Sequence, residues 1–152
     1  MPRLTVRPVT AQNWLDVLAL EVNVGQRLFV ASVERSLARA YIQPFGYTYE
    51  PMAIHVGNSL VGFYCFVYRP GDLSHCVLHN FFIDRHHQQR GYGRAFLEHF
   101  LAHLCRQTPL YHEALLTVHP DNQVAIQLYT SFGFTKTGNL FEGEEEMRLP
   151  LP

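Results

Sequence analysis

The sequence predicts an α/β fold of the α+β kind, in which helices flank a mixed, mostly antiparallel central sheet. The 152 residues suffice for one compact domain with a hydrophobic core. Apolar runs of strand length follow one another across short turns, which is typical of antiparallel pairing. Late in the chain, strand and helix patterns alternate, which favours one parallel pair. No repeat, linker or change of composition divides the sequence, so we expect one domain over residues 1–152.

Two helices are expected after a first strand. The segment "RLTVRPV" alternates in polarity and predicts that strand. Thr10 can cap the helix that follows. Its buried face would consist of Trp14, Val17, Leu18 and Val22.

The second helix is expected to begin after Ser32, a favourable N-cap residue, with Glu34 in its first turn. Leu37 and Tyr41 would face the core. The segment "QPFG" would end this helix, because proline and glycine interrupt helical structure.

The middle of the chain predicts strands. "PMAIHVG" and "LVGFYCFVY" are rich in β-branched and aromatic residues and lie on either side of "NS", so we expect a hairpin. "RPGDLS" turns the chain into an apolar strand near residues 76–84.

Strand and helix patterns alternate in the last third. A long helix is expected from about Gly91 to Arg106, followed by a short buried strand, "ALLTVH". The segment "PDNQVAIQLYTSFGF" predicts a helix begun by Pro120 and Asp121. The tail predicts two strands joined through "FEGE".

Composition excludes several classes of protein. Twelve basic and thirteen acidic residues give a formal charge of -1, which argues against binding nucleic acid through the overall field. No apolar run reaches the roughly 18 residues that a membrane helix needs, and the N-terminus lacks the apolar core of a signal peptide. Three cysteines without C-x-x-C spacing favour reduced thiols in a cytoplasmic protein.

The segment "DRHHQQRGYGRAFL" places two glycines where a strand pattern gives way to a helical one. The first turn of a helix offers unpaired N–H groups and the positive end of the helix dipole. Gly91 and Gly93 would let a phosphate approach closely, and Arg90 and Arg94 could add positive charge. An ordinary turn explains the same glycines.

Two known phosphate-binding loops do not fit this segment. The dinucleotide motif G-x-G-x-x-G would need glycine at position 96, where the chain has Phe96. The P-loop would need a Gly-Lys-Ser/Thr ending, which is absent. What remains is Q-x-x-G-x-G, formed by Gln88, Gly91 and Gly93.

A second motif lies about thirty residues further on. "HPDNQVAIQLYTSFGF" contains N-x-x-A-x-x-L-Y-x-x-x-G-F in full, formed by Asn122, Ala125, Leu128, Tyr129, Gly133 and Phe134. Together, in this order, the two motifs resemble those of the GNAT superfamily of acyl-CoA-dependent N-acyltransferases. The resemblance implies a single GNAT-like domain with acetyl-CoA as co-substrate.

The resemblance also implies roles for individual residues. Backbone N–H groups around Phe82 and Ile83 would pair with the pantetheine arm and with the thioester oxygen. Tyr129 would be the catalytic acid for the leaving thiolate, with Asn122 beside it on the cofactor side. The pyrophosphate would be held by Gln88, Gln89, Arg90, Gly91, Tyr92, Gly93 and Arg94.

The group that accepts the proton of the amine is left open by the sequence. An alkylamine has a pKa near 10, so a base or a water relay is needed. The candidates are Asp84, Glu21, Glu34, Glu50 and His119. Of these, Glu21, Glu34 and Asp84 are also the carboxylates expected to bind the substrate.

Longer segments resemble the polyamine/diamine acetyltransferase branch, namely "LEVNVGQRLFVASVERSLARAY", "GFYCFVY", "FFIDRHHQQRGYGRAFL" and "GFTKTGNLFEGEEEMRL". The resemblance implies transfer of acetyl to a primary amine of a polyamine such as spermidine or spermine. Arginines lie among the acidic residues of the first helices, so other amines stay open as acceptors: a protein N-terminus, lysine, an amino acid or an aminoglycoside. A CoA-binding sensor without catalysis is the alternative from another class. Dimers are frequent in the family, so a homodimer is compatible with the resemblance.

A metal site is not expected, although nine histidines are present. His99 and His103 have i, i+4 spacing, but the glutamate that follows the first histidine in zincins is missing, and no third ligand is evident. His86 and His87 adjoin the glycine loop. Surface or packing roles explain these histidines better.

Overall fold

The structure is a computed structural model that describes residues 3–107 and 110–152. Its elements follow one another in a mixed order of strands and helices. They are β1 (Leu4–Pro8), α1 (Trp14–Leu18), η1 (Val24–Gln26), α2 (Val33–Ile42), η2 (Pro44–Gly46), β2 (Thr48–Val56), β3 (Ser59–Tyr68), β4 (His75–Ile83), η3 (Arg85–His87), α3 (Tyr92–Arg106), β5 (Glu113–Val118), α4 (Gln123–Ser131), β6 (Thr135–Phe141) and β7 (Glu144–Pro150), where η marks a short 3-10 turn.

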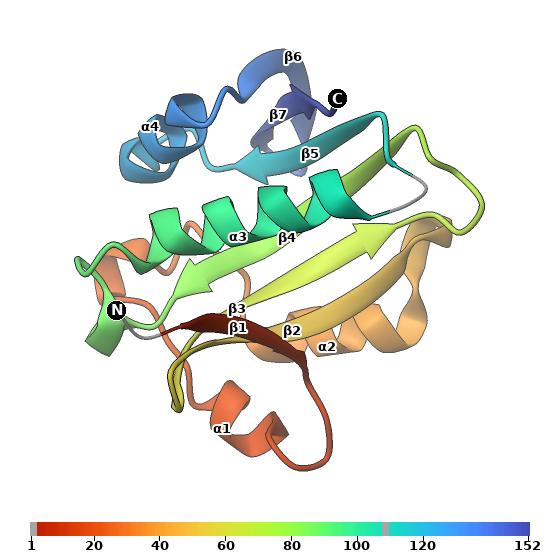
Figure 1. Ribbon diagram of the computed structural model, residues 1–152. Helices are drawn as coiled ribbons and strands as arrows, with labels where there is room; N and C mark the ends of the chain where they lie inside the picture. Colours follow the sequence, from red (N-terminus) through yellow and green to blue (C-terminus); the bar gives the residue numbers. More distant parts are fainter. Residues whose placement is uncertain (1–2, 108–109) are drawn as a thin grey trace.

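The described residues form one seven-stranded sheet in the order β1-β2-β3-β4-β5-β7-β6 (Figure 1). Every neighbouring pair is antiparallel except β4 and β5, which the α3 crossover joins in parallel. The predicted mixed, mostly antiparallel sheet with a late parallel pair is therefore confirmed. The predicted hairpins are also present, as β2–β3 and β6–β7.

Two apolar clusters pack on opposite faces of the sheet. Alternate residues of β3 enter different clusters: Tyr64 packs with Phe96 of α3, whereas Phe63 packs with Val17 of α1 and Val33 of α2. This alternation is the period of two that a strand imposes on its side chains. Helices α1 and α2 therefore cover one face and α3 the other (Figure 1).

The first helix is shorter than predicted. It ends at Leu18, its N-cap is Asn13 rather than Thr10, and Trp14 is 43% exposed. Only the stretch around Val17 packs inward. The chain leaves the helix because the Glu21 backbone N–H donates to the Asp84 carboxylate at 3.0 Å, a tertiary contact that sequence periodicity does not show.

The predicted inward position of Tyr41 in α2 is wrong, since its side chain is 88% exposed. The buried stripe runs through Val33 and Ser36, with Leu37 and Ala40 packed beside them. A helix buries positions three and four apart, and Tyr41 falls off that stripe. The capping role of Ser32 is confirmed, because its Oγ accepts from the Arg35 N–H at 3.2 Å.

The start of α4 also differs from the prediction. The helix begins at Gln123 rather than at Pro120 and Asp121, which lie in the preceding turn. Asn122 is the N-cap, and its Oδ1 accepts from the Ala125 N–H at 3.3 Å. Asparagine at this position satisfies a free N–H of the first turn, so it fixes where the helix starts.

The parallel pair β4–β5 is short, and this creates the site. Pairing runs from His75–Leu78 to Glu113–Leu116 and then stops. Beyond it the two strands spread apart toward their carboxyl ends (Figure 1). A bulge in β4 coincides with the divergence, because Asn80 and Phe81 together lie opposite Tyr64 of β3.

Candidate active site

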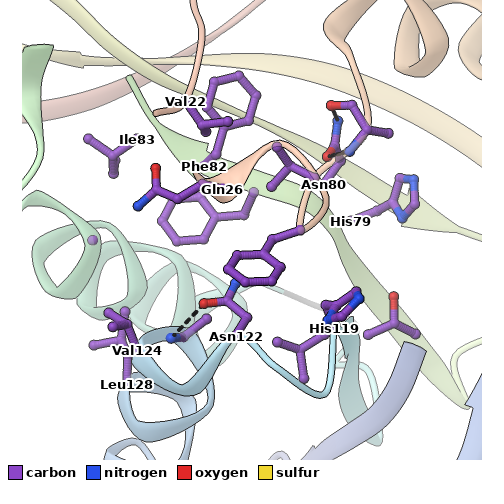
Figure 2. A pocket seen from close by; sticks show the side chains of 18 of the residues that line it. Val22, Gln26, His79, Asn80, Phe82, Ile83, His119, Asn122, Val124 and Leu128 are labelled. Carbon is purple, nitrogen blue, oxygen red and sulfur yellow. Dashed lines mark hydrogen bonds between the residues drawn. The ribbon is translucent and has the colours of Figure 1, made fainter. Parts of the chain in front are cut away.

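A cavity of about 800 Å³ fills the cleft between the diverging strands (Figure 2). One wall is the carboxyl half of β4, from His79 to Ile83, and the other is the end of β5 with α4. The α3 N-terminus closes one end, and α2 with the β6–β7 turn closes the other. Residues 26–31 cross between the two walls, and the Phe29 ring lies 5.1 Å from the His119 ring.

The bulge residue Asn80 ties the crossing segment to β4. Asn80 has a left-handed backbone with φ of 50°. Its Oδ1 accepts from the Ala31 N–H at 2.9 Å, and its Nδ2 donates to Ala31 O at 3.0 Å and Ser36 Oγ at 2.8 Å. Asparagine tolerates this conformation better than most residues. Sequence analysis missed Asn80, since a lone asparagine in a strand pattern carries no recognisable signal.

Of the two residues predicted to meet the pantetheine arm, Ile83 turns its backbone to the cleft. The Asp84 N–H donates to Val61 O at 2.7 Å, and Phe82 lies opposite Phe63. Successive residues of an antiparallel strand point their backbone groups to opposite sides. The backbone groups of Phe82 therefore face β3. Those of Ile83 face the cleft, where β5 no longer pairs with β4, and the Ile83 carbonyl accepts from Gln88 Nε2 at 2.9 Å.

The glycine loop forms the N-terminus of α3, as predicted. Gly91 is the N-cap with φ of 80°, a left-handed conformation that favours glycine. The first intrahelical bond runs from the Ala95 N–H to Gly91 O, so the N–H groups before Ala95 have no partner within the helix. Gly91, Tyr92 and Gly93 line the cavity. A Cβ on Gly93 would point to α4, 3.4 Å from Leu128 Cδ2.

The other loop residues take different places. Gln88 and Gln89 line the cavity, but the Gln88 amide is engaged with Gln26, each side chain donating to the other at 2.9 and 3.1 Å. Arg90 and Arg94 are exposed and do not line the cavity. Arg94 donates to Ser131 Oγ at 3.1 Å and lies over the Phe132 ring. The loop therefore offers backbone donors rather than guanidinium groups.

Tyr129 lies in the cavity wall and is only 7% exposed. Burial raises the pKa of its phenol, and the nearby Glu144 carboxylate raises it further. The hydroxyl therefore stays protonated over the working pH range and has a proton to donate. Among the residues that the structure describes, none forms a hydrogen bond with it.

Glu144 was not predicted as a site residue. It begins β7, is partly buried, and its Oε1 accepts from Thr117 Oγ1 of β5 at 3.0 Å. Burial is the main cause that raises its carboxyl pKa, while Thr117 and His119 act in the opposite direction. In the sequence it stands in "EGEEE", which has the composition of a solvated turn, so only its packing distinguishes it.

The far end of the cavity carries a cluster from three elements. Arg39 of α2 donates to Glu142 of the β6–β7 turn at 3.1 Å, and its Nη1 lies 3.5 Å from His79 Nε2. Burial lowers the His79 pKa to about 4, and the Arg39 charge acts in the same direction. His79 is therefore neutral at pH 7.

The carboxylates favoured by sequence analysis lie outside the cavity. Asp84 is 4% exposed and caps η3, accepting from the Glu21 and His86 N–H groups. Glu21 pairs with Arg85 at 2.9 Å, Glu34 is exposed on α2, and Glu50 accepts from Tyr68 OH beside a separate, smaller hollow. His119 and Asn122 do line the cavity (Figure 2).

In residues 3–107 and 110–152, no group of three or more His, Cys, Asp or Glu side chains is arranged to hold a metal ion. Over the same residues, no helix has the length and apolar character needed to cross a membrane. His99 and His103 lie on α3 beside a separate, smaller hollow that β2 and β3 also line.

The family follows from a comparison with known sequences. The profile of the Acetyltransferase (GNAT) family matches residues 25–134, which include both motifs and the two strands that border the cleft, β4 and β5. The chain belongs to this family. The resemblance inferred from the glycine loop and from the Asn122–Phe134 motif is thereby confirmed.

Two curated GNAT relatives are similar over nearly their full length. The probable spermine N(1)-acetyltransferase of Bacillus subtilis subsp. natto (strain BEST195) is 31% identical, covering 95% of this chain and 96% of the relative. The spermine/spermidine N(1)-acetyltransferase of Bacillus subtilis (strain 168) is 30% identical, again covering 95% and 96%.

Solved GNAT structures share the fold. Spermidine N-acetyltransferase from Vibrio cholerae, in complex with CoA and spermine, has a TM-score of 0.71 at 19% identity, covering 95% of this chain and 92% of that one. The ribosomal-protein-S18-alanine N-acetyltransferase from Escherichia coli has a TM-score of 0.69 at 24% identity, covering 98% and 94%. Because these two proteins are named for different acceptors, the fold alone does not identify the acceptor.

Proposed function

We propose that this GNAT protein transfers the acetyl group of acetyl-CoA to a primary amine of a small polyamine such as spermidine or spermine. The observation that carries the proposal is the single cavity of about 800 Å³, which joins the α3 N-terminus to Tyr129 and then to the carboxylates of the β6–β7 turn. The two curated relatives named for spermine and spermidine support the choice of acceptor.

The described residues fit acetyl-CoA. Gly91 caps α3 without a side chain, so no side chain competes for the free N–H groups of the first turn. These donors and the helix dipole favour an anionic pyrophosphate. Ile83 presents its backbone edge along the cleft, as a pantetheine arm requires. When bound, acetyl-CoA supplies an acetyl group activated as a thioester.

Tyr129 is proposed to protonate the leaving thiolate. A phenol near pKa 10 and a thiol near 8.5 differ by about 1.5 units, so this transfer costs about 2 kcal/mol in water. Burial raises the Tyr129 pKa. A thiolate that leaves inside the same cavity is also poorly solvated, and desolvation disfavours its charged form in the same way.

A panel of amines tests the proposal. Thiol release from acetyl-CoA is measured with spermidine, spermine, putrescine, lysine, an aminoglycoside and an N-terminal alanine peptide. The proposal expects the highest kcat/KM with the polyamines. Turnover with peptides or amino acids and none with polyamines would refute the acceptor, while binding of CoA without turnover of any amine would favour a sensor.

Two further expectations go with this function. A cytoplasmic location and a homodimer are both compatible with a polyamine acetyltransferase. One solved neighbour, the Vibrio cholerae spermidine N-acetyltransferase, is described as dodecameric, so assemblies differ among proteins of this fold. Light scattering after size exclusion measures the assembly, and a dimer is the expected result.

A further inference from the structure

The acceptor amine needs negative charge, and only one part of the cavity supplies it. Among the described residues, the carboxylates that line the cavity are Glu142 and Glu144, both from the β6–β7 hairpin. We infer that Glu144 binds the reacting ammonium and takes its proton, and that Glu142 binds a second ammonium of the same molecule. The inference rests on the proposed function and names the residues that select a diamine or polyamine.

Glu144 is held near Tyr129, the proposed catalytic acid. Thr117 Oγ1 donates to its Oε1 at 3.0 Å and fixes the carboxylate against β5. It lies close enough to Tyr129 for its charge to raise the Tyr129 pKa. The phenol itself is more than nine-tenths buried, lines the cavity and has a hydroxyl free of hydrogen bonds within the described residues. A carboxylate and an unengaged phenol that face one cavity can serve opposite proton transfers.

Burial makes Glu144 a better base than an exposed glutamate. Burial raises its pKa toward neutral pH, and a general base works best when its pKa lies near the working pH. His79, which also lines the cavity, is less suited, because burial and Arg39 lower its pKa to about 4. His119 is occupied through Nδ1, which accepts from the Asp121 N–H at 3.1 Å.

Glu142 is held in a conformation that glutamate rarely adopts. It is the first residue of the two-residue turn between β6 and β7, with φ of 50°, and Gly143 follows with φ of 82°. Turns of this kind favour asparagine, aspartate or glycine, because other residues are strained there. The turn aims the side chain across the mouth of the cavity at Arg39 of α2.

The Arg39–Glu142 ion pair marks where a substrate cation belongs. Arg39 lies 3.1 Å from Glu142, with side-chain exposures of 14% and 49%. Because the Glu142 carboxylate is half open to solvent, water screens its pairing with Arg39, and another cation can reach it and replace Arg39. The distal ammonium of a polyamine can do this, whereas a monoamine has no group to place there.

The reaction balances with these groups. Glu144 takes one proton from the ammonium and passes it to solvent. The freed nitrogen lone pair forms the N–C bond to the acetyl carbon, the C–S bond breaks, and the thiolate takes the Tyr129 proton. The second nitrogen proton, lost as the amide forms, restores Tyr129. One proton is released for each acetyl group transferred, and both side chains return to their starting states.

The test compares Glu142→Gln, Glu144→Gln and the control Glu98→Gln, which removes an exposed carboxylate from α3 outside the cavity. Each is assayed with spermidine and with butylamine at saturating acetyl-CoA. Glu142→Gln should raise the KM for spermidine about tenfold and leave the butylamine kinetics within twofold. Glu144→Gln should lower kcat/KM about a hundredfold or more with both amines, the effect of losing a general base.

Two readouts separate these roles from structural damage. Glutamine can still accept from Thr117, so neither variant should lose melting temperature, and CoA affinity by calorimetry should match wild type. The acid limb of the kcat/KM profile, set by Glu144, should be absent in Glu144→Gln. Full turnover of Glu144→Gln, or equal effects of Glu142→Gln on both amines, would overturn the inference. If wild type acetylates no polyamine, the proposed function itself has failed.

Discussion

The two ends of the cavity are built in different ways. At the end proposed to bind the cofactor, the loop from Gln88 to Gly93 offers backbone N–H groups from consecutive residues at the start of one helix. At the acceptor end, side chains arrive from α2, β4, β5 and the β6–β7 hairpin, including Arg39, Thr117 and Glu142. A binding site made of backbone N–H groups can keep its ligand when most of the surrounding side chains change. A binding site made of side chains changes its preferred ligand when those residues change. The comparison suggests how one fold keeps one co-substrate and takes different amines.

The largest effect should come from the residue where the two ends meet. Tyr129→Phe removes one hydroxyl from a buried ring and little volume. We expect kcat to fall by about 10²- to 10³-fold, within the range of general-acid effects, with KM nearly unchanged for both substrates. Unchanged kcat, where chemistry is shown to limit the rate, would remove Tyr129 from the mechanism.

A substitution at the cofactor end should affect acetyl-CoA alone. In Gly93→Val the new side chain projects toward Leu128 across the cleft. We expect the KM for acetyl-CoA to rise roughly tenfold or more, because a small displacement of a bound substrate is costly, while spermidine affinity stays the same. Gly25→Val is the matched control, since a Cβ there meets nothing within 4 Å. If calorimetry gives wild-type CoA affinity for Gly93→Val, the loop is not the pyrophosphate site.

A smaller and opposite effect is expected at the acceptor end. Arg39→Met removes the cation that competes for Glu142 and keeps the apolar stem of the side chain. The KM for spermidine should fall by roughly two- to fivefold, since a half-exposed ion pair is worth under about 1 kcal/mol. Butylamine serves as the internal control and should not respond. A rise in the spermidine KM would mean that Arg39 supports the geometry of the site and does not compete with the substrate for Glu142.

The smallest effect concerns stability and pH. Burial raises the Glu144 pKa in the folded state, so ionisation of this carboxyl destabilises the fold. Its contribution to stability is fully present below the unfolded pKa and is lost as pH rises through the folded pKa. Glu144→Gln should therefore melt higher than wild type at pH 7, by about 1–3 °C, and the difference should vanish below about pH 4. Equal melting curves at both pH values would contradict this account of Glu144.

Local chemistry made much of the fold predictable. The β2–β3 and β6–β7 hairpins, the α3 helix after Gly91 and the end of α2 at "QPFG" all depend on neighbouring residues. The end of α1 and the role of Asn80 were not predicted, because distant groups decide both. Asp84 draws the chain out of α1 through the Glu21 N–H, and the Asn80 side chain bonds Ser36 of α2. Such contacts join residues more than forty positions apart and leave no periodic signal.

The sequence by itself determined the family, the mixed sheet and the glycine loop that starts α3, because contiguous residues carry the two motifs and the turn and helix signals. Only the tertiary structure decided which carboxylates line the cavity. Glu21, Glu34, Glu50 and Asp84 were equal candidates by composition, yet all lie outside the cavity, whereas Glu142 and Glu144 line it. The sequence does not show which way a charged side chain points. The short β4–β5 pairing opens the cleft, and the β6–β7 hairpin places two carboxylates in its wall.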